Sequence, residues 1–305
     1  MTSLPPSGIL AAIATPVDDR LEPDHEAFLS HARHLLANGC DGLNVLGTTG
    51  QATSFSVGQR LRLMAAIASS GLPLEKMMVG TGAANLEDAV RLTQSSVELG
   101  FGGALVIPLF YYKNVSEDGV FSFFAELLAR VDGELRLYLY NFPGMSAVPF
   151  TPALVGRLLD AFPERITGLK DSSQDVAYEA ELHRLFPAFE IFAASEAQLL
   201  DARRCGYAGC ISATLNVTSA LSGRVWAGEG GEATKTAQRD LAAIRGAISE
   251  FPLVPALHHM LAHACQREGW VRVMPPLRTL TADQERALDA RLGQTAYSRG
   301  TMVSA

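Results

Sequence analysis

Lysine is the scarcest charged residue in this chain. Of the 25 basic residues in the 305-residue sequence, only four are lysines: Lys76, Lys113, Lys170 and Lys235. Arginine supplies the remaining positive charge, and its guanidinium is not deprotonated in proteins, so it cannot act as a nucleophilic amine. A reaction that needs a side-chain amine therefore has few candidates.

Other absences exclude whole classes of protein. The four cysteines, Cys40, Cys205, Cys210 and Cys265, are far apart and form no CxxC pair, which favours reduced, buried thiols over a disulfide framework or a zinc site. No apolar run reaches the ~18 residues of a membrane span, and the apolar stretch near the start is too short, and lacks the basic flank, for a secretory signal. The net charge of −7, without a basic cluster, argues against a nucleic-acid partner. We expect a soluble, cytoplasmic protein.

Short aliphatic runs recur along the first two thirds of the chain. They read GILAAIATP, GLNVLGTTG, KMMVGTG, GALVIPLF, LRLYLYNFP, RITGLKDSS, FEIFAASE and GCISATLN, and they begin near residues 8, 42, 76, 103, 135, 165, 189 and 209. The spacing between most of them is the length of one strand, one helix and two loops. The pattern therefore predicts eight strands, each followed by a helix.

The segments between these runs carry helix signals. An acidic start and a Gly stop support a helix within 23–39, Ser or Asn starts and Gly stops support helices within 56–71 and 85–100, and a Ser start supports one within 116–131. Further helices are expected within 151–163 and 196–206. Eight strand–helix units in a row predict parallel strands that close into a (β/α)8 TIM barrel, an α/β fold. We place this barrel, with the active site, at residues 1–217. Residues 218–305 show only helical patterns and are expected to form a C-terminal helical extension.

Polar side chains follow the ends of several predicted strands. GTTG follows the second run, FYYKN the fourth, YNFP the fifth and KDSS the sixth. Because the active site of such a barrel lies at the C-terminal ends of its strands, we expect Thr48, Thr49, Tyr112, Tyr140 and Lys170 to converge at one mouth.

This set of residues favours one kind of chemistry. A lysine held in an apolar pocket loses solvation, so its neutral amine becomes accessible and can attack a carbonyl carbon to form a Schiff base. A tyrosine beside it can relay protons. The GTTG turn offers hydroxyls and main-chain N–H groups for a small carboxylate. These are the parts needed to convert an α-keto acid into an enamine.

Each of these features also has a purely structural interpretation. Lys170 could be a structural lysine paired with Asp171 or with a barrel carboxylate. GTTG taken alone is an ordinary Gly-rich turn. Lys113 also falls on the upper face, but in a polar loop, whereas Lys76 begins a strand and Lys235 lies in the helical extension. Lys170 is therefore the best placed of the four lysines.

A helical segment of the extension, LHHMLAHAC, raises the question of a metal site. Its His259 and His263 are four residues apart and so lie on one face, which is a possible metal-ligand pair. No HExxH glutamate accompanies them, so we expect a packed helix face and no metal.

Six motifs in order along the chain resemble one known family. GTTG, GTGAAN, PLFYYKN, YNFP, GLKDSS and GCISATLNV, followed by a helical C-terminal region, are similar to the dihydrodipicolinate synthase / N-acetylneuraminate lyase family of pyruvate-dependent class I aldolases. The resemblance implies that Lys170 forms the imine with pyruvate and that Tyr140 relays protons. It also implies that Thr48 and Thr49 hold the pyruvate carboxylate, with Thr49 linked to Tyr140.

The resemblance has further implications. Tyr112 would complete the proton relay, in many members across a subunit interface, and Ile211 would lie against bound pyruvate. Family members use no metal or organic cofactor and are often homotetramers built as dimers of dimers. The expected partners are a small keto acid, an aldehyde and further copies of the chain.

The sequence departs from the family pattern where the acceptor should bind. The synthases have an arginine where this chain has Met145, and a lost charge-assisted contact is worth roughly 1.5–3 kcal/mol. The pair Met145–Ser146 looks closer to sialate lyases, but Ser195 and Glu196 supply at most one of their two sugar-binding acids. Gln51 replaces a glutamate that many members have. Met145, Ser146 and Ser195 are the residues expected to contact the acceptor.

The sequence thus leaves four functional hypotheses. The first is an aldolase that forms or cleaves a 2-keto-3-deoxy sugar acid or a similar 4-hydroxy-2-oxo acid. The second is a keto-deoxy sugar acid dehydratase that uses the same imine. The third is dihydrodipicolinate synthase itself, against which Met145 argues. The fourth is a non-catalytic keto-acid sensor, which would need neither Lys170 nor Tyr140.

Overall fold

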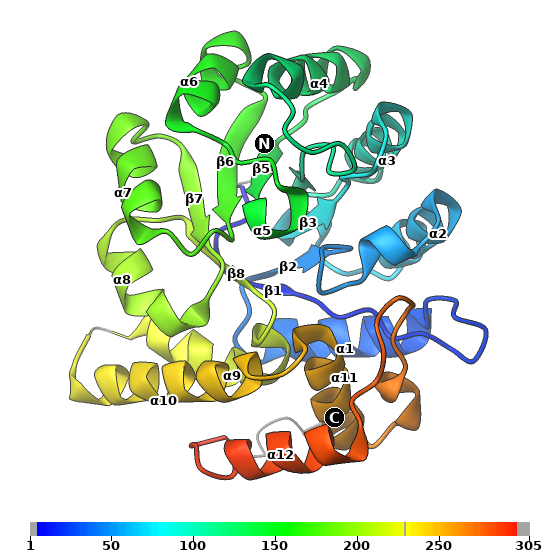
Figure 1. Ribbon diagram of the computed structural model, residues 1–305, viewed down its shortest axis with the longest axis vertical. Helices are drawn as coiled ribbons and strands as arrows, with labels where there is room; N and C mark the ends of the chain where they lie inside the picture. The colour runs from blue at the N-terminus through cyan, green and yellow to red at the C-terminus, as the bar shows by residue number, and fades with distance from the viewer. Residues whose placement is uncertain (1–4, 229, 298–305) are drawn as a thin grey trace.

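The chain forms a closed barrel of parallel strands, seen end-on in Figure 1. The computed structural model describes residues 5–228 and 230–297. The strands are β1 (Gly8–Ala12), β2 (Gly42–Val45), β3 (Met77–Gly80), β4 (Gly103–Val106), β5 (Leu137–Asn141), β6 (Ile166–Asp171), β7 (Glu190–Ala193) and β8 (Gly209–Ser212). Each strand pairs with its neighbours in sequence, and β8 pairs with β1 to close the barrel. The predicted barrel is confirmed, and every strand begins within about two residues of its expected start.

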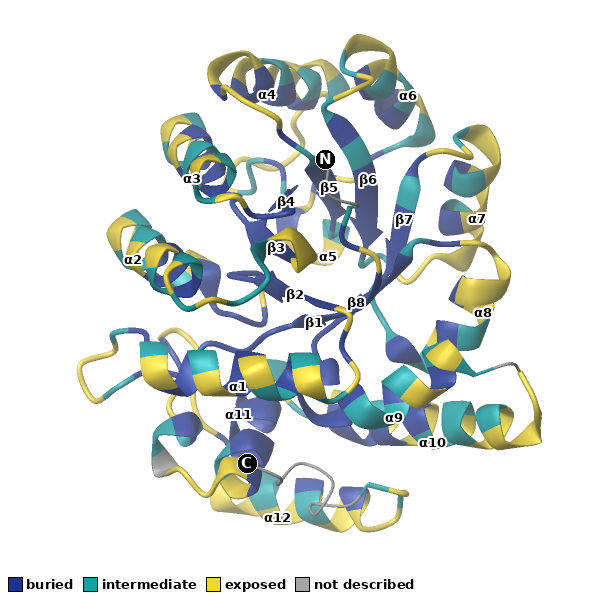
Figure 2. Cartoon of the chain, turned by 180° about the vertical axis from the view of Figure 1, so that it is seen from behind, coloured by how far each residue is buried: buried dark blue, intermediate teal, exposed yellow. Residues whose placement is uncertain are grey.

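Helices surround the barrel, with buried inner faces and exposed outer faces (Figure 2). They are α1 (His25–Ala37), α2 (Val57–Ala68), α3 (Leu86–Leu99), α4 (Glu117–Arg130), α6 (Pro152–Ala161), α7 (Val176–Leu185), α8 (Leu199–Arg204) and α9 (Leu215–Ala227), with the short α5 (Pro143–Ser146) after β5. The N-cap residues expected from the sequence, Ser56, Asn85 and Ser116, are present, and Ser56 also forms a capping box with Gln59 in α2. Helix α7 follows β6, where the strand–helix pattern predicts a helix but no particular segment was identified for it. Its N-cap Asp175 accepts hydrogen bonds from Ala177 N and Tyr178 N.

Apolar side chains also fill the inside of the barrel. One interior cluster combines residues from six strands: Leu10, Ala12, Met78, Leu105, Tyr138, Tyr140, Phe192 and Ile211. Side chains alternate along each strand, so the residues next to these point outward and pack against the helices. Tyr140 and Ile211, both expected at the site, are therefore held on the inner surface of a packed barrel.

The C-terminal extension packs beside the barrel, next to α1 and α9 (Figures 1 and 2). It contains α10 (Glu232–Ser249), α11 (Leu253–Cys265) and α12 (Ala282–Leu292). These helices share a separate apolar cluster that includes Ile244, Leu257 and Leu288. The expected boundary at residue 217 falls inside α9, which packs on β1. The outer ends of the two expected segments, residues 1–4 and 298–305, lie outside the described residues.

The expectation for the cysteines was right for only two of them. All four are free, and Cys40 and Cys210 are buried as expected, but Cys205 and Cys265 are exposed. Cys205 follows the short α8 and Cys265 ends α11, so both lie at the surface end of a helix, where the local pattern gives little indication of burial.

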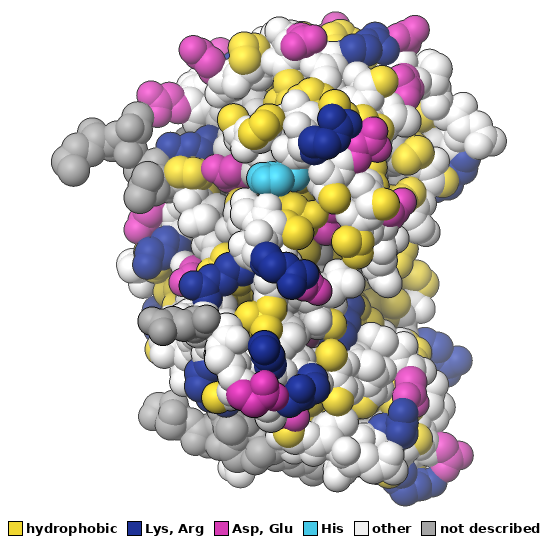
Figure 3. All heavy atoms as spheres, turned by 90° about the vertical axis from the view of Figure 1, so that its left-hand side faces the viewer, with side chains coloured by type: hydrophobic (Ala, Val, Ile, Leu, Met, Phe, Trp, Pro, Cys, Tyr) yellow, Lys and Arg dark blue, Asp and Glu magenta, His cyan; other side chains and the backbone are white. Residues whose placement is uncertain are grey.

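Two surface observations bear on partners. In the described ranges, none of the helices combines the length and apolar character needed to cross a membrane. On the face drawn in Figure 3, basic and acidic side chains are interspersed. That face therefore presents no continuous basic patch for a phosphate backbone.

Candidate active site

Lys170 and Tyr140 lie side by side at the ends of neighbouring strands. The parallel register of β5 and β6 pairs Tyr140 directly with Lys170. The Lys170 Nζ lies 4.6 Å from the centre of the Tyr140 ring, and the two residues are only 6% and 5% exposed. The ring face attracts a cation without forming a conventional hydrogen bond to it. An amine so placed can approach a carbonyl carbon from the barrel mouth.

The alternative role for Lys170, a structural ion pair, does not hold. In the part of the chain that the structure describes, Lys170 makes no salt bridge, and the carboxylate of Asp171 is bonded to other groups. Lys170 points into the barrel and Asp171 points out of it, because they are consecutive residues of one strand. The buried ammonium is thus not explained by a carboxylate partner.

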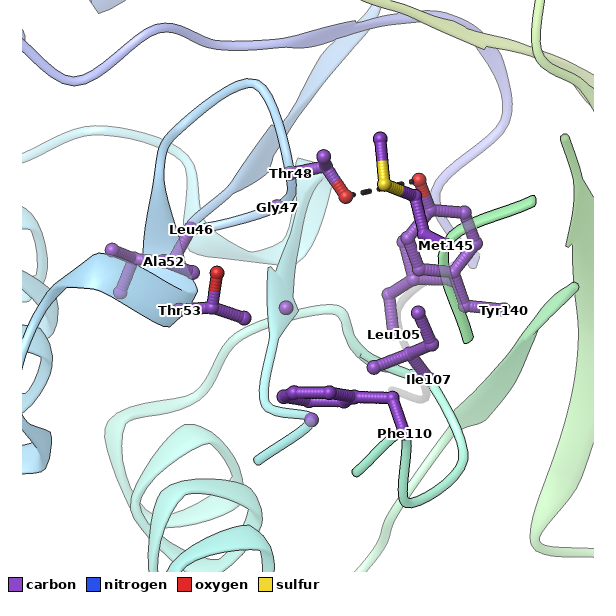
Figure 4. Close-up of a pocket in the computed structure, with 12 residues that line it drawn as sticks. Leu46, Gly47, Thr48, Ala52, Thr53, Leu105, Ile107, Phe110, Tyr140 and Met145 are labelled. Atoms are coloured by element: carbon purple, nitrogen blue, oxygen red, sulfur yellow. Dashed lines mark hydrogen bonds between the residues drawn. The ribbon is translucent and has the colours of Figure 1, made fainter. Parts of the chain in front are cut away.

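The GTTG turn reaches Tyr140 through its first threonine. The Thr48 Oγ1 lies 3.3 Å from the Tyr140 hydroxyl, and either atom can donate the proton (Figure 4). The link assigned from the resemblance to Thr49 was therefore wrong. Thr49 lies in the same turn and is buried, at 6% exposed. The shape of the turn decides which hydroxyl faces the barrel, since Leu46 and Gln51 on either side both adopt positive φ, 54° and 57°.

Gln51 connects this turn to the C-terminal extension. Its amide nitrogen lies 3.2 Å from the Thr15 carbonyl and 3.4 Å from His258 Nε2, and its amide oxygen accepts from the Met274 N–H at 2.7 Å. Burial lowers the pKa of His258 to about 4, and its Nδ1 lies 2.8 Å from the Trp270 carbonyl. The neutral ring thus donates from Nδ1 and accepts at Nε2. A carboxylate at position 51 could not donate these bonds, which explains why glutamine suits this chain.

A second pair of residues holds β5 and β6 together directly behind Tyr140 and Lys170. Asn141 and Asp171 are paired in the strand register, and the Asn141 amide donates to Asp171 Oδ1 at 2.6 Å. The Ser173 hydroxyl donates to Asp171 Oδ2 at 2.7 Å. Burial, together with the charge of Asp171, raises the pKa of Glu179 on α7 to about 7. These buried bonds fix the ends of the two strands that carry the candidate catalytic groups.

We expect Asp171→Asn to reduce turnover without preventing imine formation. In this variant the Asn141 amide faces a neutral amide, and their hydrogen bond is weaker than the bond to the Asp171 carboxylate. The ends of β5 and β6 can then shift. Small misplacements of reacting groups cost between about 10- and 100-fold in rate. Steady-state kinetics should show the loss in kcat with a smaller change in KM. Ser173→Ala, which removes a bond to Asp171 but leaves the cross-strand bond, is the matched control and should lose less. Equal losses in both variants would argue against a positioning role for the cross-strand bond.

A cavity opens beside Thr48 and Tyr140 at the barrel mouth. Its volume is about 170 Å³, and Leu46, Gly47, Thr48, Ala52, Thr53, Gly80, Gly82, Leu105, Ile107, Phe110, Tyr140 and Met145 line it. Figure 4 shows the β2 turn on one side and Ile107, Phe110, Tyr140 and Met145 on the other. Gly80 has to be a glycine, because a Cβ there would lie 2.2 Å from the Leu46 carbonyl oxygen. Met145, predicted to contact the acceptor, is placed at this cavity.

Ser146 and Ser195 are not placed as predicted. Ser146 is fully buried, its hydroxyl lies 3.1 Å from the carbonyls of Phe142 and Val148, and it also accepts from Val148 N. Ser195 caps the 3-10 helix η3 (Glu196–Gln198) by accepting from Ala197 N at 3.3 Å. Neither lines the cavity. Both stabilise turns of the backbone.

Glu196, the one acid in the expected sugar-binding position, is also turned away from the mouth. It is fully buried and accepts hydrogen bonds from the hydroxyls of Ser212 and Thr214. Arg245 of α10 binds the same two hydroxyls and lies 3.8 Å from the Glu196 carboxylate. Glu196 therefore anchors the C-terminal extension to β8, which leaves it without free oxygens for a sugar chain.

The remaining predicted residues divide into two groups. Ile211 is fully buried in the barrel interior with Tyr140, as expected for a residue beneath the substrate. Tyr112 is 70% exposed in the β4–α4 loop, with its ring edge-on to that of Tyr111 at 5.4 Å, and it does not line the cavity. Within one copy of the chain, Tyr112 does not complete the site.

The other lysine and histidine candidates have structural partners. The Lys113 ammonium donates to the carbonyls of Phe110 and Ser146, so it ties the β4–α4 loop to α5. His259 is buried between α11 and α12, with Nδ1 3.6 Å from Glu285 and Nε2 3.5 Å from Asp289. The two acids flank opposite ring nitrogens and so cannot share one ion with this histidine. Among the described residues, no group of three or more potential ligands is arranged to hold a metal.

Sequence reasoning missed several residues that shape the site. Asn141 and Asp171 are the outward-facing halves of the dipeptides YN and KD, so the strand alternation itself was a usable signal. Arg60 of α2 is another such residue, and its side chain is only 3% exposed. Its guanidinium donates hydrogen bonds to the carbonyls of Gly80 at 2.7 Å and Gly82 at 3.1 Å, two residues that line the cavity. Its burial lowers its pKa to about 10. No local pattern marks an arginine of an amphipathic helix as buried.

Known proteins resemble this chain over nearly its whole length. It matches the model of the dihydrodipicolinate synthetase family over residues 5–295. It is 31% identical over 303 residues to an uncharacterized DapA-like lyase of Chloroflexus aurantiacus, covering 96% of this chain and 97% of that relative. It is 28% identical over 289 residues to 4-hydroxy-tetrahydrodipicolinate synthase of Listeria monocytogenes, covering 93% and 97%.

Solved structures give the same result. The dihydrodipicolinate synthase of Agrobacterium tumefaciens superimposes with a TM-score of 0.87 at 27% identity, covering 95% of this chain and 99% of that one. A variant of the 2-keto-3-deoxygluconate aldolase of Sulfolobus solfataricus shares the fold, with a TM-score of 0.84 at 23% identity over 94% and 95% of the two chains. The chain belongs to the dihydrodipicolinate synthetase family and is a lyase.

Proposed function

We propose that the protein is a pyruvate-dependent Schiff-base aldolase that forms or cleaves a 2-keto-3-deoxy sugar acid or a similar 4-hydroxy-2-oxo acid. The observation that carries the proposal is the buried Lys170 amine, which has no carboxylate partner among the described residues and lies over the ring of Tyr140 at the barrel mouth. An amine in this position can reach the carbonyl carbon of a bound keto acid, and a lysine amine is the nucleophile of Schiff-base catalysis. Membership of the family supports the same assignment.

The proposed reaction assigns a step to each residue. The Lys170 nitrogen attacks the pyruvate carbonyl carbon, and water leaves to give the imine. Loss of a proton from the methyl carbon gives the enamine, whose carbon attacks the aldehyde carbon. The hydroxyl of Tyr140, in contact with Thr48, gives a proton to the aldehyde oxygen. Water then hydrolyses the imine and frees the lysine.

The turn at residues 47–50 is proposed to hold the pyruvate carboxylate. Main-chain N–H groups of Thr48 and Thr49 suit a small anion, and Ile211 lies in the same interior cluster as Tyr140. The imine itself supplies the electron sink, so the proposed chemistry needs no metal or organic cofactor.

We also propose that the working enzyme is a homo-oligomer, a tetramer made of two dimers. Tyr111 and Tyr112 are 73% and 70% exposed, which is unusual for neighbouring aromatic residues beside a cavity. Equilibrium sedimentation would give the mass of the assembly, and a monomer at micromolar concentration would contradict this part of the proposal.

The competing activities predict different products. The synthase activity named for the Listeria relative needs aspartate semialdehyde, whose charge finds no basic side chain in the cavity lining. A dehydratase would release water and retain the whole carbon skeleton, and a sensor would bind a keto acid without turnover.

An assay for released pyruvate distinguishes these activities. The enzyme is incubated with 4-hydroxy-2-oxo acids, and pyruvate is measured with a coupled dehydrogenase. We expect pyruvate release. Loss of the substrate without pyruvate would support the dehydratase, and no loss of any substrate would support the sensor.

A further inference from the structure

The cavity wall beyond Thr48 and Tyr140 is almost entirely apolar. Leu46 and Ala52 form one side, and Ile107, Phe110 and Met145 form the other (Figure 4). The side-chain hydroxyls along the wall are those of Thr48, Thr53 and Tyr140, and no charged side chain lines it. Lys170 itself does not line this cavity, but Tyr140 does, and the Lys170 Nζ lies 4.6 Å from the centre of the Tyr140 ring. The cavity therefore lies across Tyr140 from the proposed enamine, where the acceptor aldehyde would enter.

Apart from Lys170, three charged side chains on the elements around the barrel mouth are engaged elsewhere. The Lys113 ammonium donates to two carbonyls of the loops, those of Phe110 and Ser146. The Arg60 guanidinium is buried behind the wall, on the carbonyls of Gly80 and Gly82. Glu196 is fully buried against Ser212, Thr214 and Arg245. None of the three is positioned to pair with an ion in the cavity.

From this lining we infer that the acceptor is an apolar aldehyde, aromatic or branched aliphatic, whose side chain packs against Ile107, Phe110 and Met145. A carboxylate packed against these three side chains would lose its water without gaining a cationic partner, and a chain of hydroxyls would find only the few hydroxyls of Thr48, Thr53 and Tyr140. An apolar group gains from the same desolvation. The cavity of about 170 Å³ has room for a benzene ring, since a dry cavity of roughly 150 Å³ binds benzene.

This inference rests on the proposed function and narrows it. The new carbon–carbon bond joins the enamine carbon to the aldehyde carbon, the enamine electron pair forms the bond, and the aldehyde oxygen takes the Tyr140 proton. Hydrolysis then releases a 4-hydroxy-2-oxo acid whose fourth carbon carries an aryl or alkyl group. The sugar-acid products of the broader proposal carry hydroxyls at this position.

The test compares three acceptors with pyruvate on the full-length enzyme: benzaldehyde, D-glyceraldehyde and succinic semialdehyde. Pyruvate consumption gives kcat/KM for each. We expect benzaldehyde to exceed D-glyceraldehyde by about tenfold or more, and succinic semialdehyde to be poorer still. A preference for either polar aldehyde would overturn the inference.

The variant Met145→Arg tests the same wall by adding a positive charge to it. Met145 is 60% exposed, so the substitution should not disturb folding. We expect M145R to raise kcat/KM for succinic semialdehyde by about tenfold and to lower it for benzaldehyde, since Arg can pair with a carboxylate. The matched control Leu185→Arg puts the same charge on the exposed end of α7, outside the cavity lining, and should leave the preference unchanged. If M145R shifts neither aldehyde, the cavity does not hold the acceptor and the inference fails.

Failure of this inference can be told apart from failure of the proposed function. Borohydride reduction in the presence of pyruvate reports the imine without any aldehyde. A trapped imine combined with a preference for polar aldehydes, or with no use of any aldehyde, would overturn only the apolar acceptor. The absence of a trapped imine would overturn the proposed function, and the inference with it.

Discussion

Replacing Lys170 with methionine should reduce turnover by at least about 10⁴-fold, because removing the nucleophile of a covalent mechanism removes most of the catalysis. Methionine matches the length of the lysine stem and suits an apolar site. Lys170 makes no salt bridge with another described residue, so its loss should leave no buried charge unpaired. The thermal midpoint of K170M should therefore equal or exceed that of the natural protein.

A matched lysine variant controls for the loss of positive charge. Lys235 lies on the exposed surface of α10, so Lys235→Met should retain full activity. Pyruvate release from a 4-hydroxy-2-oxo acid is measured for both variants. If K170M keeps more than about a hundredth of the natural rate in folded protein, the lysine is not the covalent nucleophile.

The Tyr140→Phe variant should separate imine formation from carbon–carbon bond chemistry. It keeps the ring that packs against the Lys170 nitrogen and removes only the hydroxyl that contacts Thr48. Loss of a general acid–base group costs between about 10²- and 10⁴-fold. We expect turnover to fall by that factor while pyruvate can still be trapped on the lysine.

Two further variants serve as comparisons for the turnover of Y140F. Thr48→Val removes the hydrogen-bond partner of Tyr140 and should cost less than Y140F, because the tyrosine hydroxyl remains. Tyr138→Phe alters the preceding inward-facing tyrosine of β5, which donates to Glu190 at 2.9 Å, and should leave kcat nearly unchanged. Equal turnover in Y140F and the natural enzyme would assign the proton relay to another group.

The fold was predictable because every strand is short, aliphatic and bounded by turn residues. Counting eight strand–helix units was enough to predict that Lys170 and Tyr140 lie near each other. In such a barrel the C-terminal ends of all the strands lie on the same side. That argument needs only the order of the elements. It does not need the contacts of any particular side chain.

The direction of individual side chains in loops was not predictable in the same way. Thr48, and not Thr49, contacts Tyr140, in a turn flanked by Leu46 and Gln51, whose left-handed backbone conformations neither residue type signals. Glu196 is directed away from the mouth by Arg245, which comes from a helix of the extension. Such preferences arise from tertiary contacts that a local motif does not contain.

Tyr112 illustrates a further limit. Its position after β4 is where the resemblance requires a relay tyrosine, yet its ring is exposed in a single copy of the chain. A residue that would act across a subunit interface cannot be placed by the sequence or the fold of one subunit. Its role in the relay stays a prediction until the assembly is determined.

The most direct test of the central claim is borohydride trapping with pyruvate, followed by peptide mass mapping. The account predicts a reduced pyruvate adduct on the peptide that contains Lys170, and on none of the peptides with Lys76, Lys113 or Lys235. An adduct on another lysine, or no adduct in folded protein, would contradict it.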